Sequence, residues 1–179
     1  MKGLIAMKSL VLYSSKTGNT QKVAEAICRA LPAGTPCLPV GEAPADLSVY
    51  DCLFIGFWVD RGTADAQARK LLERLDHPSV ALFATLGADP RSQHAADSLN
   101  SAAALRPGGA PLVNSFICQG KVDPQLIAQM KKMFPAGHPH AVDAKREALH
   151  QQASSHPDAA DLDAASAFAA ATITRLENL

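Results

Sequence analysis

The chain has 179 residues, of which 47% are hydrophobic, so it is long enough for one well-buried domain and short for two. Lysine plus arginine and aspartate plus glutamate both total 17, which gives a formal net charge of zero. The composition therefore offers no electrostatic basis for binding nucleic acid or an anionic membrane.

Cysteine spacing and the N-terminal segment indicate the compartment. The four cysteines form no C-x-x-C motif and no paired spacing with histidine, so we expect reduced thiols and no metal site. The N-terminal segment MKGLIAMKSLVLYSSK has lysines on both sides of an apolar stretch too short for a secretory signal. No apolar run approaches the roughly 18 residues of a membrane span. These features predict a cytoplasmic protein.

The first predicted elements are a strand, a tight turn and a helix. Leu10 to Leu12 form an apolar run, and the residues from Gln21 to Leu31 have helical apolar spacing. A turn between a strand and a helix presents free backbone N–H groups and the positive end of the helix dipole. Such a turn is typical of a phosphate site. Side-chain donors are added by Ser14, Ser15, Thr17, Asn19 and Thr20.

The spacing of glycines and hydroxyl residues within this turn disfavours some classes of phosphate ligand. It lacks G-x-x-x-x-G-K-[ST], which disfavours nucleoside triphosphate hydrolysis, and it also lacks the dinucleotide motif G-x-G-x-x-G. The single-glycine, hydroxyl-rich loop from Ser15 to Thr20 resembles the phosphate loop of flavodoxins, which binds the terminal phosphate of FMN. Ordinary turns also have this composition. Lys16 replaces the hydroxyl residue common in flavodoxins, so it either adds charge for the phosphate or points outward.

The middle of the chain alternates strands and helices. Pro39 indicates that the second strand lies at a sheet edge, and the strand that follows is nearly continuous in apolar character, as in a strand covered on both faces. The predicted order is strand 37–40, strand 49–59, loop 58–63, a helix with Ala68, Leu71, Leu72 and Leu75 on one face, strand 80–85, loop 86–90, helix 92–104 and strand 112–118.

The C-terminal part is less regular. Asp123 and Pro124 form a strong helix start, a cap followed by proline at the first helical position. The polar segment 138–156 contains a predicted helix at 143–152, and the last helix is predicted over 158–176. The histidines His138 and His140 are interpreted as part of a solvated loop and not as metal ligands.

Alternation of this kind predicts an α/β fold with a parallel sheet and helices on both faces. By its resemblance the chain is expected to be a single flavodoxin-like domain over residues 1–179, doubly wound, with five parallel strands in the order 2-1-3-4-5 and a helical insertion before the last helix. In that order the ligand lies between the first and third strands. Loops 14–20, 58–63 and 85–89 would then meet at one ligand.

The second loop makes the resemblance more specific. The segment FWVDRGT, residues 57–63, closely resembles the corresponding loop of a flavodoxin-like family found beside bilirubin reductase in anaerobic bacteria, and YSSKTGNT and FICQGKVD also fit that family. The resemblance implies FMN as the cofactor. It implies as binding residues Ser14, Ser15, Lys16, Thr17, Gly18, Asn19, Thr20, Phe57, Trp58, Val59, Asp60, Arg61, Gly62, Thr63, Thr85, Leu86, Gly87 and Ala88.

The resemblance also implies individual roles. Trp58 stacks on the flavin or packs in the core, and Arg61 lies near the anionic reduced ring or is solvated. Gly62 resembles the glycine whose peptide turns over to accept a hydrogen bond from the reduced ring, since glycine tolerates positive φ. The backbone N–H groups of residues 85–87 would face the polar edge of the flavin.

The function favoured is an electron-transfer flavoprotein that carries electrons to a redox partner protein such as a reductase, with no catalytic residue of its own. An electron carrier is favoured over a self-sufficient FMN-dependent enzyme. One alternative is an NAD(P)H-dependent reductase of quinones, azo compounds or free flavin, and another is a flavin-free binding module. Flavodoxins are usually acidic and this chain is neutral, so no strong charge patch is expected to select the partner. We expect partner selection in the segment 120–156.

Overall fold

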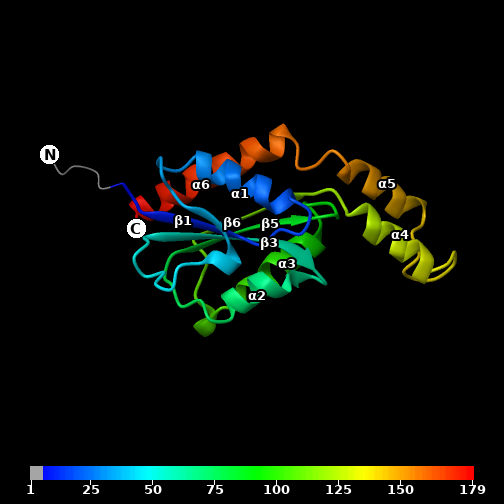
Figure 1. Cartoon of the computed structure of the whole chain (residues 1–179), viewed down its shortest axis with the longest axis horizontal. Helices are drawn as coiled ribbons and strands as arrows, with labels where there is room; N and C mark the ends of the chain where they lie inside the picture. Colours follow the sequence, from blue (N-terminus) through cyan, green and yellow to red (C-terminus); the bar gives the residue numbers. More distant parts are fainter. Residues whose placement is uncertain (1–5) are drawn as a thin grey trace.

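The computed structural model describes residues 6–179, and the first five residues of the segment used to exclude a secretory signal lie outside it. Its centre is a parallel sheet in the order β2-β1-β3-β5-β6, which confirms the predicted flavodoxin-like order (Figure 1). Proline-containing β2 lies at an edge, as expected. The strands are β1 (Ser9–Tyr13), β2 (Cys37–Pro39), β3 (Cys52–Asp60), β5 (Val80–Leu86) and β6 (Asn114–Gln119).

Helices cover both faces of the sheet. α1 (Asn19–Arg29) and α6 (Ala159–Glu177) lie side by side on one face, and α2 (Ala66–Leu72) and α3 (Gln93–Ala103) cover the other (Figure 1). Alternate side chains of each strand point to opposite faces. Val11, Phe54 and Phe83 therefore pack with α1 and α6, whereas Leu12, Ile55 and Leu82 pack with α2. Both faces are buried, which explains the nearly continuous apolar runs.

One predicted loop is largely regular structure. β3 continues to Asp60 and pairs antiparallel with the short β4 (Thr63–Ala64), so the expectation of a loop over residues 58–63 was wrong. Arg61 and Gly62 form the turn, with φ of 50° and 78°. Positive φ at both central residues is the geometry of a type I′ turn, which matches the twist of the paired strands. The chain thus forms a hairpin beside the carboxyl end of β3.

The predicted helices of the insertion are present. Asp123 caps α4 (Pro124–Met133) by accepting from Gln125 N at 2.9 Å, and Asp143 caps α5 (Ala144–Ala153) by accepting from Arg146 N at 2.8 Å. The two helices lie beyond the carboxyl ends of the strands, away from the layers that cover the sheet (Figure 1). Within residues 6–179, no helix combines the length and the hydropathy needed to cross a membrane.

Candidate functional site

A cavity of about 470 Å³ lies at the carboxyl ends of the central strands, where the strand order reverses on either side of β1. The loops after β1, β3, β5 and β6 all contribute to it, together with α4. Its lining consists of Ser15, Lys16, Thr17, Asn19, Thr20, Trp58, Val59, Asp60, Arg61, Thr85, Leu86, Gly87, Gly120, Lys121, Val122, Asp123, Leu126 and Met130.

The start of α1 forms one end of the cavity and is built for an anion. Gly18 precedes the helix with φ 92° and offers no side-chain acceptor to the first-turn N–H groups. The first turn also contains no acidic residue. By contrast, each of the other five α-helices among the described residues begins with a side chain that accepts a backbone N–H. The open N–H groups and the helix dipole together favour a negatively charged ligand.

Hydroxyl groups hold this turn in place. Ser15 Oγ accepts from Gly18 N at 3.1 Å, which shapes the turn before the helix. Thr20 Oγ1 and Thr85 Oγ1 are 2.9 Å apart and both residues are buried, so they join α1 directly to β5. The predicted phosphate and ring loops are therefore connected by a contact within the lining of the cavity.

Ser14 and Asp65 make a second connection below the cavity. Ser14 is buried and donates to Asp65 Oδ1 at 2.7 Å. The same carboxylate oxygen accepts from Gln67 N at 3.0 Å and Ala68 N at 3.3 Å at the start of α2. Asp65 follows the β3–β4 hairpin directly, so its carboxylate fixes the hairpin relative to the loop after β1.

The β3–β4 hairpin forms a second wall of the cavity, which carries both an aromatic ring and charged side chains. Trp58 is partly exposed at the cavity, and Lys16 Nζ lies 5.5 Å from the centroid of its ring. This is a cation–π contact between the loop after β1 and the end of β3. The cavity has three cationic side chains, Lys16, Arg61 and Lys121, against two acidic ones, Asp60 and Asp123.

The segment after β6 forms a third wall and packs tightly against the other loops. Gly120 N donates to Leu86 O at 2.8 Å, and Asn19 Nδ2 donates to Lys121 O at 2.9 Å. There is no room for larger residues at the contact: a Cβ on Gly120 would lie 2.9 Å from Asn19 Nδ2, and one on Gly87 would overlap the Val122 side chain. This wall is thus held against both predicted loops.

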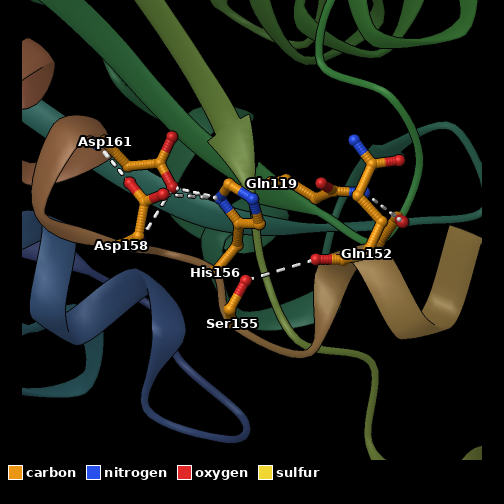
Figure 2. A network of polar contacts seen from close by, with 7 residues as sticks. Gln119, Gln152, Ser155, His156, Asp158 and Asp161 are labelled. Carbon is orange, nitrogen blue, oxygen red and sulfur yellow. Dashed lines mark hydrogen bonds and ion pairs between the residues drawn. The ribbon is translucent and has the colours of Figure 1, made fainter.

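The C-terminal end of the insertion lies beside its N-terminal end, next to the wall that begins at Gly120. Lys121 N donates to His156 O at 2.9 Å, so the insertion's entry and exit are hydrogen-bonded to each other. Figure 2 shows His156 beside Asp161, whose Oδ2 lies 2.6 Å from His156 Nδ1. Asp158 N donates to Asp161 Oδ2 and Asp161 N donates to Asp158 Oδ1, forming the capping box of α6. His156 therefore anchors the exit of the insertion.

Twelve of the predicted binding residues line the cavity and six do not. Phe57 is fully buried in the core, Ser14 lies beneath the loop, and Thr63 pairs with Asp60 across the hairpin. The other three that do not line it are Gly18, Gly62 and Ala88. Whether these positions bind the cofactor remains a prediction.

Sequence reasoning missed the wall formed by residues 120–123 with Leu126 and Met130. Residues 120–123 could have been predicted. They follow β6, which neighbours β5 in the expected strand order, so this loop must reach the same edge of the sheet as the loop after β5. Leu126 and Met130 lie on α4, whose position relative to the sheet no local pattern indicates.

Comparison with known proteins gives relatives that match over nearly the whole chain. A flavodoxin-like domain-containing protein BilS from Clostridioides difficile (strain CD3) is 35% identical over 166 residues, covering 91% of this chain and 94% of the relative. A protein of the same name from Clostridium symbiosum (strain WAL-14163) is 31% identical over 175 residues, covering 88% and 92%.

Solved structures agree on the fold. Oxidised flavodoxin 2 from Bacillus cereus superposes with a TM-score of 0.56 at 21% identity, covering 94% of this chain and 99% of its own. A WrbA-like flavodoxin from Agrobacterium tumefaciens gives a TM-score of 0.54 at 14% identity, covering 97% and 99%. The model of the flavodoxin domain family matches residues 10–170. With this match and two relatives above 30% identity, the chain belongs to the flavodoxin-like family.

Proposed function

We propose that this chain binds FMN non-covalently in the cavity and carries electrons to a separate redox partner protein. Membership of the flavodoxin family supports FMN as the cofactor. The observation that carries the proposal is the meeting of three features in one cavity: the uncapped start of α1, the partly exposed ring of Trp58 and the backbone of residues 85–87.

The residues present fit FMN. The cavity volume of about 470 Å³ lies in the range of roughly 300–1,000 Å³ typical of small-molecule sites. Ser15, Thr17 and Asn19 supply donors beside the first turn of α1, where a phosphate monoester would bind. Each donor to a charged acceptor contributes about 1.5–3 kcal/mol. Several donors therefore make an anchor strong enough to retain the cofactor.

Bound FMN would supply one- and two-electron transfer chemistry, and the chain would supply position and environment. Trp58 offers a ring face for stacking, an arrangement that contributes about 0.5–1.5 kcal/mol beyond area burial. Leu126 and Met130 of α4 add apolar side chains to the lining of the cavity. The cationic side chains of the cavity outnumber the acidic ones by three to two, which suits an anionic ligand.

The α4–α5 hairpin is proposed as the surface that selects the partner. Leu126 is 41% exposed and Met133 is 67% exposed, on a helix that also lines the cavity. Residues 120–156 contain five lysines and arginines against three aspartates and glutamates. This combination fits a partner protein with an apolar contact area and acidic residues around it.

The first test is the visible absorption spectrum of the purified protein, before and after addition of FMN and removal of the excess. Flavin bands retained at one FMN per chain are expected. A colourless protein that takes up no FMN would reject the proposal and favour the flavin-free module. Steady-state oxidation of NADPH by the isolated protein would instead favour the self-sufficient reductase.

The partner surface has a separate test. Met133→Ser changes an exposed apolar side chain that does not line the cavity. The matched control is Val49→Ser, because Val49 is 49% exposed and lies outside the α4–α5 hairpin. We expect Met133→Ser to slow electron transfer to a purified partner reductase and to leave reduction of the small acceptor ferricyanide unchanged. Equal partner rates for Met133→Ser and Val49→Ser would contradict the assignment of this surface.

A further inference from the structure

We propose that Lys16 acts on the ring of the bound flavin and not on its phosphate, and that it makes the second electron easier to add. This inference rests on the proposed function, because it concerns FMN in the same cavity. It assigns Lys16 a role different from that of Ser15, whose hydroxyl accepts from Gly18 N just before α1.

The first support is the direction of the side chain. Lys16 belongs to the turn before α1, yet its ammonium group lies over the ring of Trp58, 5.5 Å from the centroid. Trp58 lies near the end of β3, in the β3–β4 hairpin beside which the flavin ring is expected. The charge of Lys16 is thus carried from the phosphate end of the cavity to the ring end.

The second support is that this charge is available. Among the ion pairs of residues 6–179, none includes Lys16. Its backbone lies in the anion-binding turn, but that turn is already supplied with donors by Ser15, Thr17 and the N–H groups of α1. A phosphate held there would leave the Lys16 ammonium free to remain at Trp58.

The third support is the chemistry of the flavin. Uptake of two electrons and one proton from the reductant and solvent leaves the isoalloxazine ring with one additional negative charge. A cation beside the ring stabilises this anion relative to the oxidised, neutral ring, and it does so more strongly where apolar groups exclude water. Leu126 and Met130 provide apolar groups in the lining of the same cavity. Lys16 therefore favours the fully reduced state.

The experiment compares Lys16→Gln with Lys22→Gln. Lys22 is an exposed residue of α1 outside the cavity, so its substitution removes the same charge from a nearby position. The potentials of the two one-electron steps are measured anaerobically with dithionite and indicator dyes, and the dissociation constants of oxidised FMN and of riboflavin are measured by fluorescence titration.

For Lys16→Gln we expect an equilibrium constant for addition of the second electron about tenfold smaller, which is a shift of about 59 mV to more negative potential. The ratio of the FMN and riboflavin dissociation constants should stay unchanged. Lys22→Gln should alter neither quantity, and Lys16→Arg should restore the potential.

Other outcomes overturn the inference in distinguishable ways. Weaker binding of FMN but not of riboflavin, with an unchanged potential, would make Lys16 a phosphate ligand. Equal shifts for Lys16→Gln and Lys22→Gln would show a general effect of net charge. Failure of the unmodified protein to take up FMN would reject the proposed function itself and the inference with it.

Discussion

The cavity has two kinds of wall, and they differ in how they are supported. The loops after β1, β3 and β5 rise from strands that are buried on both faces, and buried hydroxyl and carboxylate contacts join them from below. The wall formed by residues 120–130 belongs to an insertion in which α4 has no buried residue. It is held by backbone hydrogen bonds, by the Asn19 side-chain amide and by close contact at two glycines.

This difference in support suggests that the two kinds of wall have different roles. A rigid framework fixes the groups that are proposed to hold the cofactor, whereas the proposed partner surface rests on a small number of contacts. Regions with little buried apolar area open at lower free-energy cost than the core. We therefore expect substitutions in the framework to affect cofactor retention or folding, and substitutions at the insertion to have smaller, local effects.

The largest expected effect is at the start of α1. Gly18→Asp places a carboxylate beside the proposed phosphate site, at a position with φ 92° that L-residues rarely adopt. With the loss of two charged hydrogen bonds at about 1.5 kcal/mol each, FMN should bind at least about 100-fold more weakly. Fluorescence titration with FMN measures this. The matched control is Gly18→Asn, since asparagine is neutral and tolerates this backbone conformation.

The second prediction concerns the framework below the loops. A Cβ on Gly56 of β3 would overlap the ring of Phe83, which is fully buried. Gly56→Ala should therefore lower the free energy of unfolding by about 1–3 kcal/mol, as measured by urea denaturation. Gly41→Ala is the control, because a Cβ there meets no atom within 4 Å. Equal losses in the two variants would show that crowding at Phe83 is not the cause.

The third prediction tests the contact between the two walls. Gly120→Ala brings a Cβ to 2.9 Å from Asn19 Nδ2, which must move and weaken its hydrogen bond to Lys121 O. We expect the binding free energy of FMN to weaken by about 1 kcal/mol, which is a roughly fivefold loss of affinity. In an Asn19→Ala background the same substitution should cost less, because the crowded group is gone. An equal cost in both backgrounds would contradict this explanation.

The smallest expected effect is pH-dependent and lies at the exit of the insertion. The N–H of Asp161 donates to the Asp158 carboxylate and lowers its pKa below the ordinary 3.8. A lowered folded-state pKa stabilises the fold above the unfolded-state pKa, and the contribution is lost as pH falls through the folded-state value. Asp158→Ala should lower the melting temperature at pH 7, and the difference from the unmodified protein should shrink as the pH falls below 3.8 and through the lowered folded-state pKa. Thermal melts between pH 2 and 7 check this.

The framework was predictable because its signals are local. Apolar runs such as Leu53 to Phe57 mark strands covered on both faces, and the turn at Gly18 marks a strand-to-helix junction. Alternation of strands and helices then fixes a parallel sheet, and the carboxyl-edge rule brings the loops together. The strand order and the location of the cavity follow from these signals with the family resemblance.

Other features depend on contacts between distant segments, which no local pattern carries. The Ser14–Asp65 hydrogen bond spans 51 positions, and the Asn19–Lys121 bond spans 102. The β3–β4 hairpin was missed because its turn is Arg-Gly, whereas the usual residues for such a turn are Asn-Gly or Asp-Gly. The cavity wall at Leu126 depends on where α4 docks, and this is decided by the backbone contacts of residues 120 and 121.

The hydrogen bond between Lys121 N and His156 O has a further consequence for how such proteins can diversify. It closes the insertion at its base, so the residues between these two points form an excursion whose ends stay together whatever its length. Lengthening a closed loop costs little, about 0.6 kcal/mol for each doubling. Natural variation or protein engineering can therefore exchange the α4–α5 unit while the sheet and its other loops stay unchanged, and under the proposed role of this unit such an exchange would change the partner protein.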